Sequence, residues 1–248
     1  MKKGLVKKTA VILLALLLLV PYITASGIVN EDVGAKRPNS KSIMSVEEIL
    51  NDINARLGSD LEALPPTQKG ELHASEIFFT GQELLDVIEL FESSAIEVLE
   101  NNASVDRIWY ERTGIPPEEI EWITDECDDI YNETTETDSS IQSNTATYNS
   151  TRNAWGANSW ITATARGTIF ITSPRRFQTI SSVSSHCQRM VGILYLETFK
   201  RSSHTLSFID SGRTAAVNIT GVLTRTYPLG VTTTQTLKVY TEFHAGNP

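Results

Sequence analysis

The stretch from Thr134 to Arg152 constrains the fold most, because it consists mainly of Ser, Thr, Asn and acidic residues. It holds no apolar run that could bury a face, so we expect a linker or an extended loop there. Before this linker the apolar residues recur at helical spacing, and after it they alternate with polar residues. The sequence therefore predicts an α+β protein, with a small helical N-terminal domain followed by an antiparallel β-sandwich or barrel.

The two sides of this linker carry opposite net charge. Residues 28–148 contain 27 acidic and 7 basic side chains, whereas residues 149–248 contain 10 basic and 3 acidic ones. We therefore expect an acidic helical domain over residues 45–133 and a basic β-domain over residues 153–248. Such opposite charges attract each other, or attract outside partners of the opposite sign.

Residues 1–27 have the pattern of a secretory signal peptide. Four lysines precede an apolar run from Ala10 to Val20, and small residues follow at the end of the segment. The apolar run is shorter than the roughly 20 residues that span a bilayer; an uncleaved membrane anchor is the alternative. The sequence thus predicts a secreted, extracellular protein without a membrane span after cleavage. Residues 28–44 are expected to be a flexible lead-in.

Within the acidic domain the spacing of apolar residues predicts four helical segments. Ser45 and Glu48 form a capping-box pattern at the start of the first helix, and Gly58 is placed to end it. The other three segments are expected over residues 80–102, 105–112 and 117–131. Short breaks between such segments indicate a small helical bundle.

Beyond the linker, apolar and polar residues alternate as in half-buried antiparallel strands. The first strand is expected from Trp160 to Thr172, with Gly167 at a bulge or bend. Later strands are expected over residues 177–183, 188–199, 206–209, 215–224 and 236–244. Turn patterns occur at residues 173–176, 210–213 and 228–230.

The sequence contains no recognisable catalytic or metal-binding pattern. The four histidines are not at metal-ligand spacing, and there is no P-loop, dinucleotide fingerprint or G-x-S-x-G serine. We therefore expect no cofactor and no metal, and the sequence assigns no catalytic residue.

The two cysteines, Cys127 and Cys187, predict one disulfide in an exported chain. Cys127 falls on the apolar face of the helix expected over Pro117–Tyr131. We expect that face to dock onto the β-domain and to bring the two thiols together. The alternative is two unpaired thiols, each packed as a small hydrophobic residue in its own domain.

Two sets of residues are candidates for ligand binding. Two tryptophans flank the start of the first strand, where exposed rings would stack on sugars and buried rings would plug one end of the core. Most basic residues of the β-domain are arginines, whose planar side chains suit carboxylates and phosphates; a scattered solvated surface would have the same composition. The candidates for ligand binding are Arg166, Arg175, Arg176, Arg213, Trp155 and Trp160.

These features favour an exported, non-enzymatic binding protein. Its basic β-domain would engage an anionic partner: an envelope polymer, an acidic protein or the acidic helical half of the same chain. No nucleic-acid partner is expected. A secreted hydrolase is one alternative, with His186, His204 or His244 acting beside Glu197 or Glu242. A basic effector domain that an acidic pro-region masks until the linker is cut is another.

Overall fold

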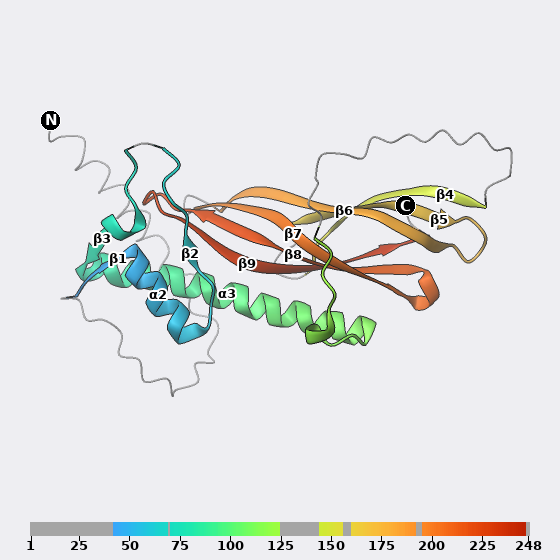
Figure 1. The fold of residues 1–248 in the computed structure, drawn as a ribbon, viewed down its shortest axis with the longest axis horizontal. Coiled ribbons are helices and arrows are strands. Elements are labelled where there is room, and N and C mark those ends of the chain that lie inside the picture. Colours follow the sequence, from blue (N-terminus) through green and yellow to red (C-terminus); the bar gives the residue numbers. More distant parts are fainter. Residues whose placement is uncertain (1–41, 69, 125–143, 156–159, 192–194, 247–248) are drawn as a thin grey trace. The chain divides into compact units, whose positions relative to one another are not determined.

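The computed structural model describes residues 42–68, 70–124, 144–155, 160–191 and 195–246. Among these residues the fold is α+β, with two α-helices and one large antiparallel sheet (Figure 1). The helices are α2 (Val46–Leu57) and α3 (Gly81–Thr113). The strands are β1 (Ile43–Ser45), β2 (Glu62–Ala63), β3 (Phe78–Thr80), β4 (Thr145–Asn153), β5 (Thr162–Phe170), β6 (Arg176–Val191), β7 (Tyr195–Ile209), β8 (Thr214–Thr226) and β9 (Thr232–His244).

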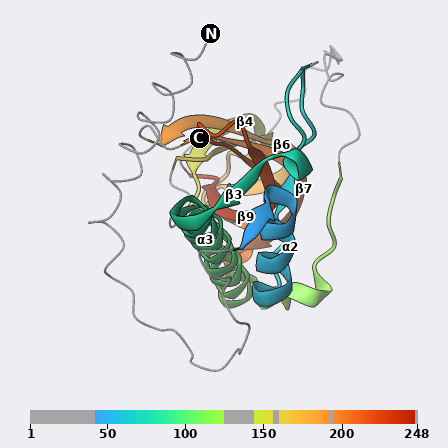
Figure 2. The same cartoon turned by 90° about the vertical axis from the view of Figure 1, so that its left-hand side faces the viewer.

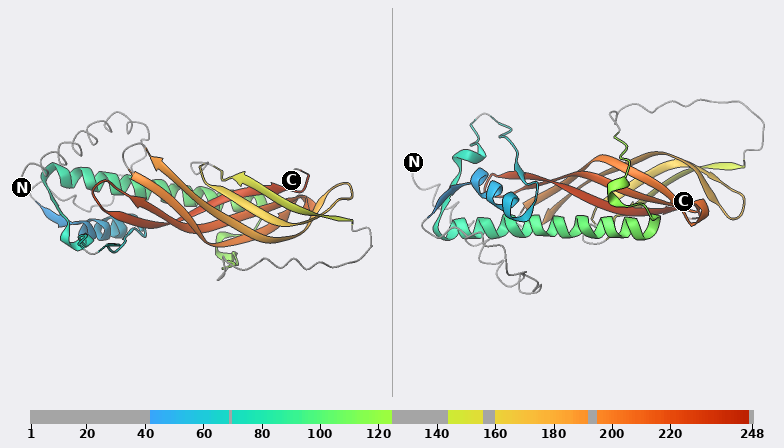
Figure 3. Two further views of the ribbon diagram at one scale, coloured as in Figure 1. Left: turned by 90° about the horizontal axis from the view of Figure 1, so that it is seen from above. Right: turned by 60° about the horizontal axis from the view of Figure 1, so that its bottom comes forward.

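Seven strands form one sheet in the order β2-β9-β8-β7-β6-β5-β4, and β1 pairs with β3 in a separate two-stranded sheet. From β4 to β9 the order in the sheet follows the order in the chain, which is the pattern of a meander (Figure 3). The sheet is not closed, because β2 and β4 stand at its two ends. The α+β class is thus confirmed, whereas a sandwich or barrel is not confirmed by the described strands.

The chain divides into two compact units, and each combines helical and strand residues. Unit 1 contains the described parts of Met1–Leu99, together with Gln188–Glu197 and Thr224–Gln235. Unit 2 contains the described parts of Glu100–Cys187, Thr198–Leu223 and Thr236–Pro248. Each unit therefore takes residues from both the acidic and the basic stretch of the sequence.

Two segments that the sequence predicts to be irregular form strands. Ile43–Ser45, at the end of the expected lead-in, is β1 and pairs with β3. Thr145–Asn153, where the end of the linker is expected, is β4 and pairs with β5 along its whole length. Tyr148 is the one buried residue of β4, so this strand has no apolar alternation to detect. The predicted signal peptide and the first part of the predicted linker lie outside the described residues.

Helix α2, in unit 1, begins and ends where the sequence predicts. The Ser45 hydroxyl accepts a hydrogen bond from the Glu48 amide (3.2 Å), and the Glu48 carboxylate accepts one from the Ser45 amide (2.7 Å). Gly58 ends the helix in the left-handed conformation, with φ of 68°. The apolar stripe is buried in a core shared with the first part of α3, which lies beside α2 (Figure 2). The buried residues of the stripe are Val46, Ile49, Leu50 and Ile53.

Helix α3 is one continuous helix, whereas the sequence predicts a break after Asn101 and Asn102 (Figure 3). The prediction of two helical pieces is wrong because these side chains bond to strand β9, in unit 2, instead of competing for the helix backbone. The Asn101 amide group donates to the Lys238 carbonyl (2.8 Å). The Asn102 amide group donates to the Thr236 carbonyl (3.0 Å), and its oxygen accepts from the Lys238 backbone amide (2.8 Å).

The helix predicted over Pro117–Tyr131 is wrong in its described part. Pro117–Glu119 form only a short 3₁₀ turn. Ile123 is extended and pairs with His204 of β7, donating to its carbonyl (2.7 Å) and accepting from its amide (3.0 Å). Proline and acids suit the first turn of either helix type, so the sequence does not show where the helix stops. Residues 125–131 lie outside the described ranges.

The predicted bulge at Gly167 is confirmed. The pairing of β5 with β6 shifts register between Arg166 and Gly167. A Cβ atom at residue 167 would collide with the Thr179 carbonyl oxygen and would lie 2.9 Å from the Ile180 Cα. The backbone of β6 therefore passes too close to residue 167 for any side chain.

The strands after the bulge are longer than the sequence predicts. One strand, β6, covers the expected strand 177–183 and the start of the expected strand 188–199. The two later turns are confirmed. Asp210, Ser211 and Gly212 have positive φ values (52°, 58° and 82°) between β7 and β8. Gly230 has φ of 80° and donates its amide to the Tyr227 carbonyl (3.0 Å) between β8 and β9.

Strand β8 is buried on both faces through its first half, in unit 2. On one face Ala216 packs with Trp109 of α3 and Tyr240 of β9, whose rings meet edge to face with centroids 6.4 Å apart. Two residues further along β8, Asn218 is fully buried. Its side-chain amide has no hydrogen-bond partner among the described residues.

An ionic network with a buried pair at its centre lies in unit 1. Arg225 is 4 % exposed and donates to Glu197 (2.7 Å), which is 1 % exposed. The same guanidinium donates to Glu97 (2.9 Å) and to the Ser94 carbonyl and hydroxyl, and Arg189 donates to the second oxygen of Glu197 (2.6 Å). Two cations thus face two anions, which satisfies charges that would be costly to bury alone.

Replacing Gly167 with alanine is expected to lower the free energy of unfolding by about 1–3 kcal/mol, because the new methyl group overlaps the backbone of β6. Urea denaturation of wild type and variant measures the change. Gly246→Ala is the matched control, since a Cβ there meets nothing within 4 Å. Equal denaturation midpoints for all three proteins would contradict the close approach.

Tyr195 is expected to make unit 1 sensitive to alkali. Burial, assisted by Glu197 and Glu97 and opposed by Arg225, raises the pKa of Tyr195 to about 12. In the unfolded chain the Tyr195 hydroxyl ionises near pH 10. The free energy of unfolding is therefore unaffected by this group below about pH 10 and falls as the pH rises from there towards 12. Tyr195→Phe should therefore flatten the alkaline loss of stability in urea denaturation measured from pH 8 upwards. Parallel losses in wild type and variant would refute this.

Candidate functional site

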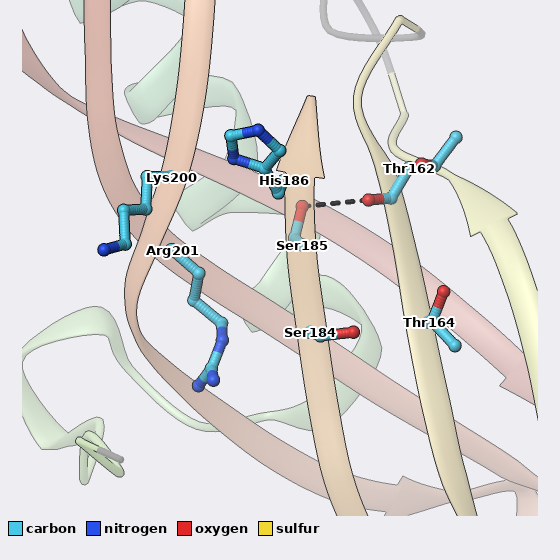
Figure 4. A pocket seen from close by; sticks show the side chains of 7 residues that line it. All are labelled: Thr162, Thr164, Ser184, Ser185, His186, Lys200 and Arg201. Carbon is cyan, nitrogen blue, oxygen red and sulfur yellow. Dashed lines mark hydrogen bonds between the residues drawn. The ribbon is translucent and has the colours of Figure 1, made fainter. Parts of the chain in front are cut away.

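The candidate site is a pocket of about 450 Å³ on strands β5, β6 and β7 of unit 2. In Figure 4, β5 provides Thr162 and Thr164 on one side and β7 provides the basic residues on the other, with β6 between them. The lining residues are Thr162, Thr164, Ser184, Ser185, His186, Lys200 and Arg201. The pocket is therefore built from hydroxyl groups, an imidazole and two permanent cations.

Strand pairing positions the hydroxyl side of the pocket. Thr164 of β5 lies opposite Ser184 of β6, and Ala163 lies opposite Ser185. Ser185 is 7 % exposed and donates its hydroxyl to the Thr162 carbonyl (2.9 Å), which ties the two strands together at the pocket. Ser184 points to the exposed face because neighbouring strand residues alternate.

Strand β7 provides the positive charge. Lys200 is exposed and Arg201 is half-buried. A guanidinium nitrogen of Arg201 lies 3.1 Å from Nδ1 of His204. Arg166, two residues beyond Thr164 on β5 and opposite Ser182, is exposed and extends the basic face along the sheet. No acidic residue is among those that line the pocket.

These groups suit an anion. Hydroxyl groups donate to phosphate or carboxylate oxygens, and guanidinium and ammonium groups add charge-assisted hydrogen bonds. The guanidinium of Arg201 can meet two oxygens of one anionic group, whereas Lys200 acts as a mobile point charge. The lining of the pocket is therefore chemically suited to a phosphate or carboxylate group.

The sequence-predicted arginines do not share one site. Arg166 lies beside the pocket, as described above. Arg175 and Arg213 line a different cavity of about 370 Å³ in unit 2, and Arg176 lies next to it, with its Cβ 3.9 Å from where a Cβ on Gly212 would stand. All four side chains are exposed.

The two tryptophans differ in environment. Trp155 is 50 % exposed, and its ring meets Tyr240 edge to face with centroids 5.9 Å apart. Trp160 is half-buried. One ring is thus open to solvent and the other is partly covered, and their role in ligand binding stays a prediction.

The predicted disulfide stays untested. Cys187 is a free cysteine among the described residues, and its thiol donates to the Trp160 carbonyl (2.8 Å). Cys127 lies outside the described residues.

The carboxylates considered for a hydrolase are engaged by other donors. Glu197 accepts from two arginines in unit 1, as described above. In unit 2, Glu242 accepts from the Arg112 guanidinium (2.7 Å) and from the Tyr240 hydroxyl (2.7 Å). Of the histidines, His244 has its Nδ1 3.1 Å from the Thr214 hydroxyl, and His186 lines the pocket.

Sequence reasoning missed most of the pocket. Lys200 and Arg201 are two of the ten basic residues in 149–248, and nothing in the sequence distinguishes them as ligand-binding residues. The hydroxyl residues carry no motif. These residues have only their positions on the adjacent strands β5, β6 and β7 in common, and those positions become known only from the pairing of the strands.

No family model matches the chain, and no curated protein and no solved structure is significantly similar to it. The described residues contain no group of three or more His, Cys, Asp or Glu that could hold a metal ion. No helix in the described ranges is both long and apolar enough to cross a membrane.

Proposed function

We propose that this chain is an exported, non-enzymatic binding protein that engages an anionic partner through the pocket on β5, β6 and β7. The partner is a phosphate- or carboxylate-bearing envelope polymer or an acidic protein surface. The observation that carries the proposal is the lining of the pocket, in which Lys200, Arg201 and His186 lie with the hydroxyl groups of Thr162, Thr164 and Ser184 and with no acid.

The environment of the other basic residues supports this choice of site. Arg225 is neutralised by Glu197 and Glu97 inside unit 1, and Lys238 is paired with Asp106 in unit 2 (2.7 Å). Such residues hold the fold together and are not available to an outside anion. In the pocket, by contrast, the Lys200 side chain is exposed to solvent beside hydroxyl residues.

The pattern of hydroxyl groups favours a ligand with repeated anionic groups. Thr164 and Ser184 lie opposite each other on β5 and β6, and Arg166 and Ser182 are the next pair along the same face. A polymer lying along this face would meet two hydroxyl groups at the first pair and a cation with a hydroxyl group at the second. Its affinity would fall with added salt, because exposed charges about 10 Å apart are screened at 0.1 M ionic strength.

The test uses a chain that begins at residue 28, which retains every described residue, and inorganic polyphosphate and poly-glutamate as probes. Fluorescence anisotropy is measured at low ionic strength and at about 0.15 M. Replacing Lys200 and Arg201 together with alanine should weaken binding about 25-fold at low salt. This follows from about 1 kcal/mol, or roughly fivefold, for each of the two charges.

The matched control is Arg107→Gln, which removes an exposed positive charge from α3. It should bind both probes like wild type. The proposal fails if wild type binds neither probe at low salt, or if the control loses as much affinity as the pocket variant.

A further inference from the structure

A second surface of unit 2 lies at the end of the sheet, where three chain segments meet beside the start of β4, whose Thr145 pairs with Phe170. These are the turn between β5 and β6, the turn between β7 and β8, and the end of β9 (Figure 1). Gly212 of the second turn lies against Arg176 of the first, and the Ala245 amide donates to the Arg213 carbonyl (2.9 Å). We call this surface the hairpin end; it comprises residues 170–176, 208–214 and 244–246.

The hairpin end exposes apolar side chains. Phe170 is 38 % exposed, Ile171 is 48 % exposed and Phe208 is 43 % exposed. Phe208 stacks on the buried Phe177 with ring centroids 5.9 Å apart. The Phe177 ring therefore supports one face of the exposed Phe208 ring. Phe170 and Ile171 are consecutive, and consecutive residues of an extended chain point to opposite faces. Apolar groups thus occur on both sides of the same turn.

The hairpin end is also positively charged. Arg175, Arg176 and Arg213 are all exposed. Asp210 is its one acidic residue, and Arg112 lies 3.6 Å from that carboxylate. Arg175, Arg213 and His244 line the cavity of about 370 Å³, together with Pro174, Asp210, Thr214 and Gly246. A recess of this size with two guanidinium groups at its wall accommodates a phosphate-sized anionic group.

We propose that the hairpin end is an interfacial binding site for an anionic lipid bilayer. Phe170, Ile171 and Phe208 would enter the boundary between headgroups and acyl chains, and the three arginines would contact lipid phosphates. Exposed apolar residues flanked by basic residues are the composition of membrane-surface segments.

The arrangement favours lipid over a protein partner. Phe170 and Ile171 give the turn apolar groups on two faces, and an interfacial site in a bilayer can cover both together. The exposed arginines lie on the same two turns as these apolar groups, at the end of the sheet, which matches a negatively charged surface approached end-on. This inference does not depend on the pocket on β5, β6 and β7.

The test is co-sedimentation of the chain from residue 28 with vesicles of equal parts phosphatidylglycerol and phosphatidylcholine, and with vesicles of phosphatidylcholine alone. Wild type should bind the anionic vesicles and release from them as salt is added. Replacing Arg175, Arg176 and Arg213 together with glutamine should reduce binding about 100-fold, at roughly fivefold for each arginine near an anionic surface. Replacing Phe170 and Ile171 together with serine should reduce it at least tenfold.

Two controls make the result specific to the hairpin end. Val222→Ser removes a 42 % exposed apolar side chain from β8 and should bind vesicles like wild type, as should Arg107→Gln, which removes an exposed positive charge from α3. In an independent measurement, the added tryptophan of Ile171→Trp should shift its emission to shorter wavelength with anionic vesicles. No vesicle binding by wild type, equal binding by the hairpin-end variants, equal loss in Val222→Ser, or self-association that accounts for the sedimentation would each overturn the proposal.

Discussion

In unit 2 the side chain of Asn102 completes strand β9 as a neighbouring strand would. Its oxygen accepts from the Lys238 amide and its nitrogen donates to the Thr236 carbonyl, so one side-chain amide replaces one peptide group of a missing strand. Asn101 adds a bond to the Lys238 carbonyl. Because α3 supplies these bonds, the helix must run in a set register along β9. The long helix and the sheet in unit 2 depend on this constraint.

Side-chain charges then follow that register along the helix. Asp106 meets the Lys238 ammonium one turn after the asparagines, and Arg112 meets Glu242 further on. In unit 1 the same helix offers Glu97 to Arg225. Some of the opposite charges of the two halves of the sequence thus form ion pairs with each other inside each unit. Among the described basic residues of 149–248, the exposed ones lie at or beside the pocket on β5, β6 and β7 (Arg166 and Lys200) and at the hairpin end (Arg175, Arg176 and Arg213).

Local features of the fold could be predicted from sequence because they depend on neighbouring residues. Ser45 and Glu48 cap the start of α2 and Gly58 ends it, and all three are close in sequence to the helix. Gly167 likewise indicates a bulge in its own strand, whichever strand pairs with it. Features that depend on distant partners could not. From sequence alone Asn102 indicates the end of a helix, because its partner on β9 is far away in the chain. In β4, apolar and polar residues do not alternate, so the sequence does not indicate a strand. The pocket could not be predicted for the same reason. Two register shifts between β5 and β6 change which residues pair, so the pairs near the pocket cannot be found by counting residues from the turn that joins the strands.

The burial of Asn218 has a consequence for producing this protein. Asn218, Ile219 and Thr220 form a sequence that eukaryotic secretory cells glycosylate, and they do so before the chain has folded. In the folded chain Asn218 is fully buried on a strand that is covered on both faces. A sugar attached there leaves no room for the core around Ala216 and Trp109 to close. The host chosen for expression therefore decides whether this sheet can form.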